Sequence, residues 1–295
     1  MDSSQNENVG LYSWFLLLLL SLTWGSSYIL MKYGLLAYSP EQMASLRITI
    51  SMLSFLPLFI IRFRKIDWSK WKYFLIIGLA GNFFPSFFFA FAETEISSSL
   101  AGVLSSLTPL FTLLLGLLIY GVQFSWFKAV AVVIGLCGAV VLVLFGSGAN
   151  FEGNRWYALL VVGATMMYAI SSNTVKEHLS DVKPIDMSIA SFIMVGIPAM
   201  LYLLTTDFLH RLTTHESGWS SLGYISILAI AGTVIASILF YKLVQLTNAV
   251  IASMVSYLVP VVALFWGFMD GETISIYHFL GMGLILVGVY ISRRG

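Results

Sequence analysis

Residues 97–121, SSSLAGVLSSLTPLFTLLLGLLIYG, return in altered form as residues 249–272, AVIASMVSYLVPVVALFWGFMDGE. Positions that match at an offset of 151 residues are Ala101 and Ala252, Leu107 and Leu258, and Pro109 and Pro260. Each stretch is apolar, long enough for a membrane helix, and carries one proline in its interior. The pair therefore indicates that the chain contains one membrane unit written twice.

The matches continue outward from these two stretches. Pairs at an offset of 144 residues are Trp24 and Tyr168, Lys32 and Lys176, Pro40 and Pro184, and Met43 and Met187; pairs at 151 are Gly81 and Gly232, and Phe89 and Phe240; pairs at 150 are Gly121 and Gly271, and Gly138 and Gly288. We expect two repeats, residues 1–148 and 149–295. If each crosses the bilayer five times, the second begins on the opposite side, which is the inverted duplication of many secondary transporters.

Composition places the chain in a membrane. Hydrophobic residues make up 59% of its 295 residues, charged residues 10%, and the mean hydropathy is +0.91. A soluble protein of this composition would expose large apolar surfaces. The net charge of +1 and the lack of a basic tail make nucleic acid an unsuitable partner. The single Cys137 has no partner for an intramolecular disulfide.

The fold class expected is all-α, with ten membrane-spanning helices. About 20 mostly apolar residues are needed to cross the hydrocarbon. Ten runs fit: 14–33, 42–61, 71–92, 97–120, 127–145, 156–175, 185–204, 222–243, 249–268 and 275–291. The first is expected to be a retained helix, because residues 1–13 contain no Lys or Arg and no small-residue cleavage site follows.

Positive charges orient these spans. With ten spans, eleven Lys and Arg residues fall on one side and three on the other, with Arg47 inside a span. Short loops rich in Lys and Arg stay in the cytoplasm. We therefore expect a multi-pass protein of the cytoplasmic membrane with both termini in the cytoplasm.

Polar and aromatic side chains within spans are candidates for a substrate-binding cavity, because polar groups are costly in a bilayer. The candidates are Trp24, Ser27, Tyr28, Asn82, Phe84, Phe88, Ser105, Pro109, Tyr168, Ser172, Thr233, Ser237, Tyr241, Ser256, Tyr257 and Pro260. The alternative is that small hydroxylated residues hold transmembrane helices together. The aromatic members alternatively pack or lie at the interfaces.

Pro109 and Pro260 predict matched interruptions of the fourth and ninth spans. A proline removes one helical hydrogen bond and frees the carbonyl four residues earlier, that of Ser105 in one repeat and Ser256 in the other. Interrupted helices in corresponding halves point to a midplane site. An ordinary packing kink is the alternative.

Ionisable residues lie mainly toward the span ends. Arg47, Glu93 and Glu95 fall at a similar depth on the outer side, so a possible gate is an ion pair between Arg47 and one of the two glutamates; snorkelling is the alternative. A doubly charged solute would need deep Lys or Arg partners. A neutral, zwitterionic or aromatic small molecule is therefore the expected substrate, and the coupling ion, proton or other, stays open.

Five segments carry a family resemblance: TWGSSYILMK (23–32), LRITIS (46–51), the stretches 97–121 and 249–272, and FLGMGLILVGVY (279–290). In these segments the chain resembles the EamA-type members of the drug/metabolite transporter superfamily. The resemblance implies ten helices in two inverted halves, a central cavity from spans one, three, four, six, eight and nine, and export of small metabolites by alternating access. Gly271 and Glu272 match a Gly-Glu pair of the family, but Gly121 of the first repeat is followed by Val122.

The function expected is that of a secondary transporter of small organic metabolites such as amino acids or aromatic compounds. The family resemblance implies export. A channel or structural membrane protein is the alternative, and an integral-membrane enzyme a weaker one, because His178, His210, His215 and His278 lack metal-ligand spacing and no catalytic set converges. No metal and no cofactor is expected. No P-loop is present, although a partner ATPase chain and the oligomeric state stay open.

Overall fold

The structure, a computed structural model, describes residues 3–119, 126–145 and 154–292, and most of these residues are helical. No strand occurs within these ranges. The helices of the first half are α1 (Ser3–Gly25), α2 (Ser27–Gly34), α3 (Pro40–Arg62), η1 (Phe63–Lys65), η2 (Trp68–Lys70), α4 (Trp71–Gly78), η3 (Leu79–Phe83), α5 (Phe84–Ala92), α6 (Ser98–Leu104), η4 (Ser105–Leu107), α7 (Thr108–Ile119) and α8 (Trp126–Phe145).

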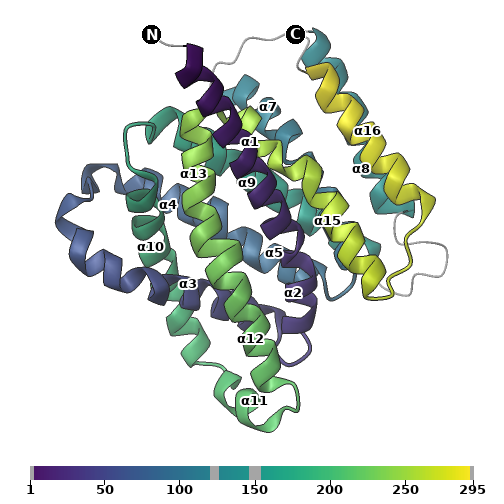
Figure 1. The fold of residues 1–295 in the computed structure, drawn as a ribbon. Helices are drawn as coiled ribbons and strands as arrows, with labels where there is room; N and C mark the ends of the chain where they lie inside the picture. The colour runs from purple at the N-terminus through teal and green to yellow at the C-terminus, as the bar shows by residue number, and fades with distance from the viewer. Residues whose placement is uncertain (1–2, 120–125, 146–153, 293–295) are drawn as a thin grey trace.

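The second half follows a similar order (Figure 1). Its helices are η5 (Arg155–Tyr157), α9 (Ala158–His178), α10 (Pro184–Leu204), α11 (Phe208–Thr214), α12 (Gly218–Ala229), η6 (Ile230–Ile235), α13 (Ala236–Leu246), α14 (Ala249–Ser253), α15 (Val255–Met269) and α16 (Ile276–Ser292). The short α11 lies in the connection between the expected spans 185–204 and 222–243. The expected boundary between residues 148 and 149, and the residues Gly121 and Val122, lie outside the described ranges.

Eight continuous helical stretches of the described residues are long and apolar enough to cross a membrane. They are Gly10–Gly34, Pro40–Lys65, Trp68–Ala92, Ser98–Ile119, Ala158–His178, Pro184–Leu204, Gly218–Leu246 and Ile251–Met269. Each overlaps one expected span. The expected fifth and tenth spans coincide with α8 and α16, whose strongly apolar stretches are shorter, Val133–Leu142 and Ile276–Gly288. The result is an all-helical, multi-pass architecture.

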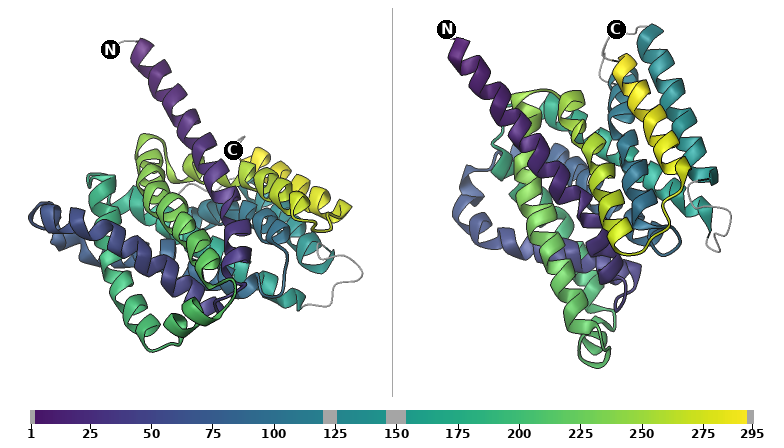
Figure 2. Two further views of the ribbon diagram at one scale, coloured as in Figure 1. Left: turned by 60° about the horizontal axis from the view of Figure 1, so that its bottom comes forward. Right: turned by 45° about the vertical axis from the view of Figure 1, so that its right-hand side comes forward.

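Corresponding helices of the two halves pack against each other. α3 lies along α10 and α8 along α16, and α8 and α16 are side by side on one flank in every view (Figure 2). α6 of the fourth span lies along α15 of the ninth, although the offset of 151 residues relates α6 to α14 and α7 to α15. The rings of Phe55 and Phe192 stack at 5.3 Å between α3 and α10. A Cβ at Gly138 of α8 would lie 2.7 Å from the carbonyl oxygen of Gly281 on α16. Small residues therefore let these helix backbones approach closely, as in membrane helix pairs.

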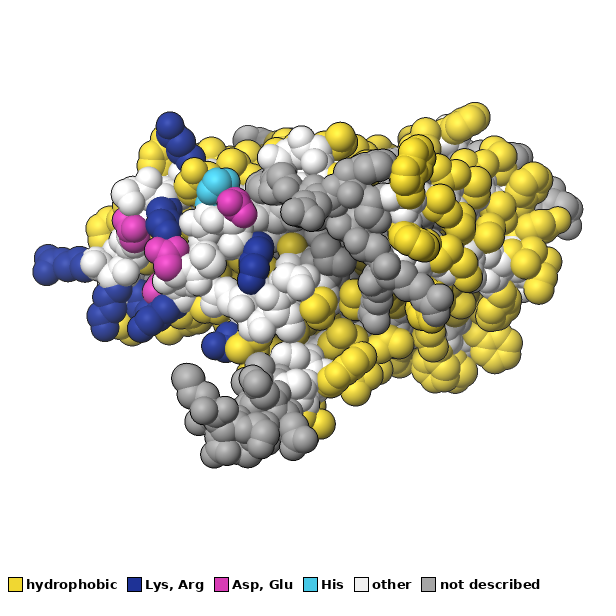
Figure 3. Space-filling view, turned by 90° about the horizontal axis from the view of Figure 1, so that it is seen from above, with side chains coloured by type: hydrophobic (Ala, Val, Ile, Leu, Met, Phe, Trp, Pro, Cys, Tyr) yellow, Lys and Arg dark blue, Asp and Glu magenta, His cyan; other side chains and the backbone are white. Residues whose placement is uncertain are grey.

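Basic side chains gather on part of the end that carries the chain termini. The start of α1 and the end of α16 lie at the same end (Figure 1), and Lys and Arg side chains gather on one side of that end, opposite a broad apolar flank (Figure 3). Here Arg62 of α3 makes two hydrogen bonds, of 2.6 and 2.9 Å, with the carboxylate of Asp186 on α10. Lys70 pairs with Asp181 nearby. These ion pairs tie the first half to the second at this end.

Candidate functional site

Three of the long helical stretches are interrupted near the middle of the molecule. Ser26 separates α1 from α2, the 3-10 turn η4 separates α6 from α7, and Met254 separates α14 from α15. Interrupted helices expose backbone groups that a continuous helix would satisfy. In a membrane protein such irregular backbone is tolerated where it lines a protein interior or a cavity.

The two proline positions behave differently. Pro109 lies in the first turn of α7, directly after η4, and the hydroxyl of Thr108 donates to the freed carbonyl of Ser105 at 2.8 Å. Pro260 lies inside α15, and the break in that span occurs earlier, at Met254. The interruptions expected from the prolines are present in both spans, but they do not fall at equivalent positions.

Two further irregularities are a matched pair that the sequence reading missed. η3 and η6 are π-helical segments, and their first residues, Leu79 and Ile230, are 151 residues apart, the offset of the surrounding repeat landmarks. A π segment widens one helical turn and is frequently found at functional sites. Gly81 and Gly232, already recognised as a repeat pair, lie within these segments and were the available signal.

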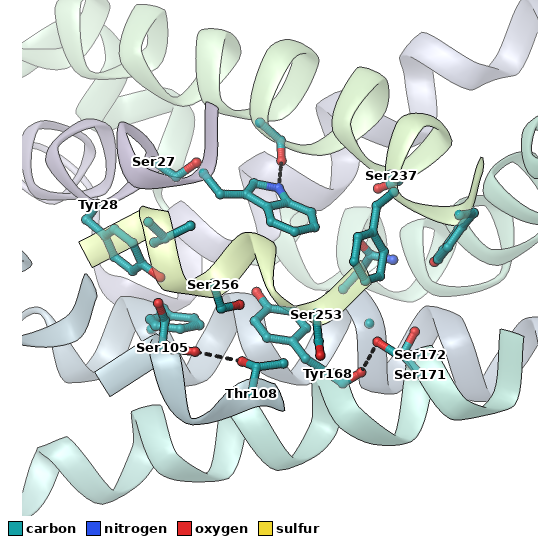
Figure 4. Close-up of a pocket in the computed structure, with 18 of the residues that line it drawn as sticks. Ser27, Tyr28, Ser105, Thr108, Tyr168, Ser171, Ser172, Ser237, Ser253 and Ser256 are labelled. Atoms are coloured by element: carbon teal, nitrogen blue, oxygen red, sulfur yellow. Dashed lines mark hydrogen bonds between the residues drawn. The ribbon is translucent and has the colours of Figure 1, made fainter. Parts of the chain in front are cut away.

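A pocket lies where the interruptions and π segments meet. It holds about 850 Å³ of space not occupied by atoms, part of it open to the surroundings. Figure 4 shows serine, threonine and tyrosine side chains from several helices gathered around it. Its lining residues are Trp24, Ser27, Tyr28, Met31, Arg47, Gly81, Asn82, Phe89, Ser105, Thr108, Tyr168, Ser171, Ser172, Gly232, Ser237, Phe240, Tyr241, Ser253, Ser256 and Val259. They come from the six spans implied by the family resemblance and, through Arg47, from the second span.

Two aromatic pairs related by the repeat offsets form part of the wall. Trp24 contacts Phe240 with ring centroids 5.1 Å apart, and Tyr168 stacks on Phe89 at 6.1 Å. Trp24 corresponds to Tyr168, and Phe89 corresponds to Phe240. Each pair therefore joins one half to the other, and the two pairs present comparable apolar surfaces to the same space.

Glycines of the π segments face serines of the opposite half. A Cβ at Gly81 would lie 2.6 Å from the hydroxyl of Ser171, and a Cβ at Gly232 would lie 3.0 Å from that of Ser27. The indole N–H of Trp24 donates to the carbonyl of Gly232 at 3.0 Å. A side chain at Gly81 would require the hydroxyl of Ser171 to move, and one at Gly232 would require a smaller shift of the Ser27 hydroxyl, so the two glycines bring these serines close to the backbone of the π segments.

Arg47 supplies a charge that the sequence reading did not place in the cavity. Its side chain is buried, lines the pocket, and donates from Nε to the hydroxyl of Thr233 at 2.9 Å. One Nη lies 4.0 Å from the sulfur of Met31. Hydropathy predicts the depth of Arg47 along its span but not the direction of its side chain. The pocket therefore contains a guanidinium, which suits recognition of a carboxylate.

The three residues of the expected gate, Arg47, Glu93 and Glu95, are not bonded to one another in the described structure. Among the described residues, no ion pair joins Arg47 to Glu93 or Glu95. Glu95 accepts the backbone N–H of Asn154 at 2.8 Å. Glu93 has both carboxylate oxygens buried without a hydrogen-bond partner in the described structure. The gate stays a prediction.

Ten of the predicted cavity residues line the pocket, and six lie elsewhere. The ten are Trp24, Ser27, Tyr28, Asn82, Ser105, Tyr168, Ser172, Ser237, Tyr241 and Ser256. The six are Phe84, Phe88, Pro109, Thr233, Tyr257 and Pro260. Phe84 is 41% exposed, and Phe88 packs near Gly163 instead of on the pocket. Thr233 is buried behind the lining, where it holds Arg47. The rotation of α5 about its axis, which the sequence does not specify, directs Phe89 toward the pocket instead of Phe88.

A polar cluster closes the end of the molecule away from the chain termini. The carboxylate of Glu272 accepts N–H groups of Ser98 and Ser99 at 3.2 and 3.0 Å, and the hydroxyl of Ser99 at 2.6 Å. Lys32 lies 3.1 Å from Glu272 and 2.5 Å from Asp270. Burial tends to raise the pKa of Glu272, but the hydrogen bonds from Ser99 and the charge of Lys32 lower it on balance. Lys32, Ser98 and Ser99 belong to the first half and Glu272 to the second, so the cluster is a latch between the halves.

Comparison with known proteins gives consistent results. The model of the EamA-like transporter family matches residues 11–144 and 155–294. An uncharacterized transporter of Archaeoglobus fulgidus is 29% identical over 282 residues, covering 95% of this chain and 98% of its own. The uncharacterized inner membrane transporter YedA of Escherichia coli K12 is 27% identical, covering 94% and 89%.

Two more distant similarities span nearly the whole chain. A protein of Streptantibioticus cattleyicolor described as a probable terminal-alkyne amino-acid exporter is 22% identical over 284 residues, covering 94% of this chain and 92% of its own. A crystal structure superposes with a TM-score of 0.63 at 18% identity, covering 96% of this chain and 98% of that one. The last similarity shows a shared fold.

Proposed function

The chain belongs to the EamA-like transporter family, and on that premise we propose that it is a secondary transporter that exports small organic metabolites, such as amino acids or aromatic compounds, across the cytoplasmic membrane. The single observation that carries this proposal is the pocket between the halves, walled by hydroxyl groups, two aromatic pairs and one buried guanidinium. Such a mixture of apolar surface and a few polar groups is typical of small-molecule sites.

The lining favours a zwitterionic or aromatic solute. Arg47 offers a charge-assisted bond to one carboxylate, and the described pocket holds no second Lys or Arg to balance a doubly charged phosphate. The Trp24–Phe240 and Tyr168–Phe89 pairs offer faces for an apolar or aromatic side chain. An amino acid satisfies both features, and the similarity to a probable exporter of an amino acid agrees with this choice.

Alternating access is the mechanism that suits this arrangement. Two inverted five-helix halves would rock about the pocket, exposing it to each side in turn. Support comes from the π segments, aromatic pairs and glycine–serine contacts that recur at the repeat offsets. Both termini and the basic end carrying Arg62 and Lys70 would lie in the cytoplasm.

Counterflow in proteoliposomes tests the proposal. The purified protein is screened by thermal shift against the common amino acids and aromatic metabolites, and each solute that stabilises it is loaded into vesicles and exchanged for the labelled form. We expect saturable, counterflow-stimulated uptake, lost in Trp24→Ala, Tyr168→Ala and Asn82→Ala. Trp14→Ala is the matched control, because Trp14 lies on the same helix α1 but is 62% exposed. Equal flux in all three pocket variants would move the pathway elsewhere.

A further inference from the structure

Glu93 stands out because its carboxylate is buried and unpaired. It directly follows α5, and its backbone N–H donates to the carbonyl of Phe89 at 2.9 Å, one turn back. Both carboxylate oxygens are shielded from solvent and accept no hydrogen bond from any residue that the structure describes. Phe89 lines the pocket, so Glu93 lies one helical turn beyond the pocket wall.

An ionised carboxylate in this position would be strongly disfavoured. Burying a charge without a partner costs several kcal/mol, and a buried carboxyl avoids this cost by holding a proton. Glu272, at the same end of the molecule, shows the opposite arrangement, with both oxygens supplied with donors from Ser98, Ser99 and Lys32. The two glutamates therefore differ in the charge that this conformation permits.

The groups facing Glu93 allow its charge to change when the surroundings open. Lys32 of α2 and Arg47 of α3 favour the ionised form, and Glu272 opposes it. Tyr28 of α2 also interacts electrostatically with Glu93. Tyr168 lies on the adjacent α9, and Glu95 lies two residues after Glu93 in the turn that follows α5. Lys32 is engaged by Asp270 and Glu272, and Arg47 by Thr233, so neither neutralises Glu93 in the closed arrangement.

We propose that Glu93 is the proton-binding site that couples solute movement to a proton gradient, an inference that rests on the proposed transport function. A proton from outside water forms an O–H bond with the carboxylate when the outer end is open. Closure then buries the neutral acid. When the pocket opens to the cytoplasm, the O–H bond breaks, the proton passes to water in the pocket, and the ionised carboxylate is stabilised by Arg47.

A proton fits this position better than a metal cation. A metal ion requires several oxygen, nitrogen or sulfur ligands around it. Within the described residues, no group of three or more His, Cys, Asp and Glu side chains could hold one. A proton needs only one of the two carboxylate oxygens.

Infrared spectroscopy tests the site without any solute. In lipid at neutral pH, the wild-type protein should show the carbonyl stretch of a protonated carboxylic acid, and Glu93→Gln should remove it. Glu95→Gln should retain the band, because Glu95 already accepts an N–H from Asn154. Glu93→Asp, which keeps a titratable group, should move the band and provides a reading if Glu93→Gln folds poorly. Identical spectra for wild type and both Glu93 variants would overturn the proposal.

Driven transport tests the coupling. For exchange of one proton with one solute of no net charge, a pH difference of one unit supports about a tenfold solute gradient, since one unit is worth 1.36 kcal/mol. The wild-type protein should approach this solute gradient. Glu93→Gln should leave equal solute concentrations on the two sides. The control Glu41→Gln, at the outer end of α3, should match wild type. Accumulation by Glu93→Gln equal to that of wild type would refute the coupling role.

The two experiments separate this inference from the transport proposal beneath it. Solute flux without the infrared band would overturn the proton site and leave the transporter intact. The infrared band without flux of any solute would overturn the transport function, and the coupling role with it.

Discussion

Replacing Glu272 with Gln should weaken the latch between the halves. One carboxylate oxygen, Oε2, accepts from both the N–H and the hydroxyl of Ser99, and the other, Oε1, accepts from the N–H of Ser98 and from Lys32. Glutamine has only one acceptor oxygen. Its NH₂ group must therefore face a backbone N–H, that of Ser98 or that of Ser99, whichever way the amide is turned.

The magnitude follows from the better of the two orientations. If the amide oxygen keeps the Ser99 contacts, the NH₂ faces Ser98 and Lys32, and Lys32, whose side chain is 39% exposed, can turn toward Asp270 and solvent. The loss is then one charge-assisted bond to Ser98, with weakening of the Ser99 bonds from charged to neutral, at roughly 1.5–3 kcal/mol for a bond to a charged group. With the Lys32 contribution discounted for solvent screening, we expect Glu272→Gln to cost about 2–3 kcal/mol.

Thermal unfolding of the purified protein across pH is the assay. A cost of this size should lower Tm by about 5 °C at pH 7. Because the pKa of Glu272 lies below its ordinary value of 4.5, the carboxylate contributes its stability above that pH and loses it as pH falls through the lowered folded value. The difference between wild type and variant should therefore shrink in acid.

Glu95→Gln is the control for this experiment, because Glu95 accepts a single backbone N–H in an exposed setting, and its change in Tm should be small. Equal Tm values for wild type and Glu272→Gln at pH 7 would refute the reasoning. A difference that persists unchanged below both pKa values would refute the assignment of the effect to the charge.

Three further changes are expected to have distinct effects. Gly102→Ala should cost about 2 kcal/mol of stability through overpacking and lower Tm, because its Cβ would overlap that of Ala263. Gly223→Ala, with no neighbour within 4 Å of the new Cβ, should leave Tm unchanged. Asp186→Ala should cost about 2 kcal/mol by leaving Arg62 unpaired, whereas Asp181→Ala, which removes the 70% exposed partner of Lys70, should change Tm little. Arg47→Gln should raise the KM of any transported amino acid at least tenfold, the loss of one charge-assisted bond of about 1.5 kcal/mol, and unchanged KM would remove Arg47 from carboxylate binding.

Hydrophobic runs located the membrane helices well, because the length of the hydrocarbon constrains the sequence directly. The expected span 42–61 corresponds to Pro40–Lys65, and 185–204 to Pro184–Leu204. The start of the second span has local signals too, since Ser39 caps α3 in a capping box with Gln42. Such features are written in adjacent residues and need no knowledge of tertiary packing.

The rotation of each helix was harder to predict, because it depends on the neighbouring helices. The sequence predicts Phe88 as a cavity residue, but Phe89, which pairs with Phe240 at the repeat offset, lines the pocket instead. Arg47 was read as a residue near the outer side, but packing directs its side chain into the pocket. Repeat-related residues were the better guide to the wall, since two inverted copies place equivalent positions around one shared space.

Cysteine accessibility at Ser256 tests most directly whether this pocket faces each side of the membrane in turn. Replacing Cys137, the only cysteine, with Ser gives a background in which Ser256→Cys is the sole target, and Ser45→Cys, buried away from the pocket, is the control. We predict that a membrane-impermeant thiol reagent labels Ser256→Cys when added to either side, that a transported solute slows labelling, and that Ser45→Cys stays unlabelled. Labelling of Ser256→Cys from neither side, or from one side only under every condition, would contradict an alternately exposed pocket.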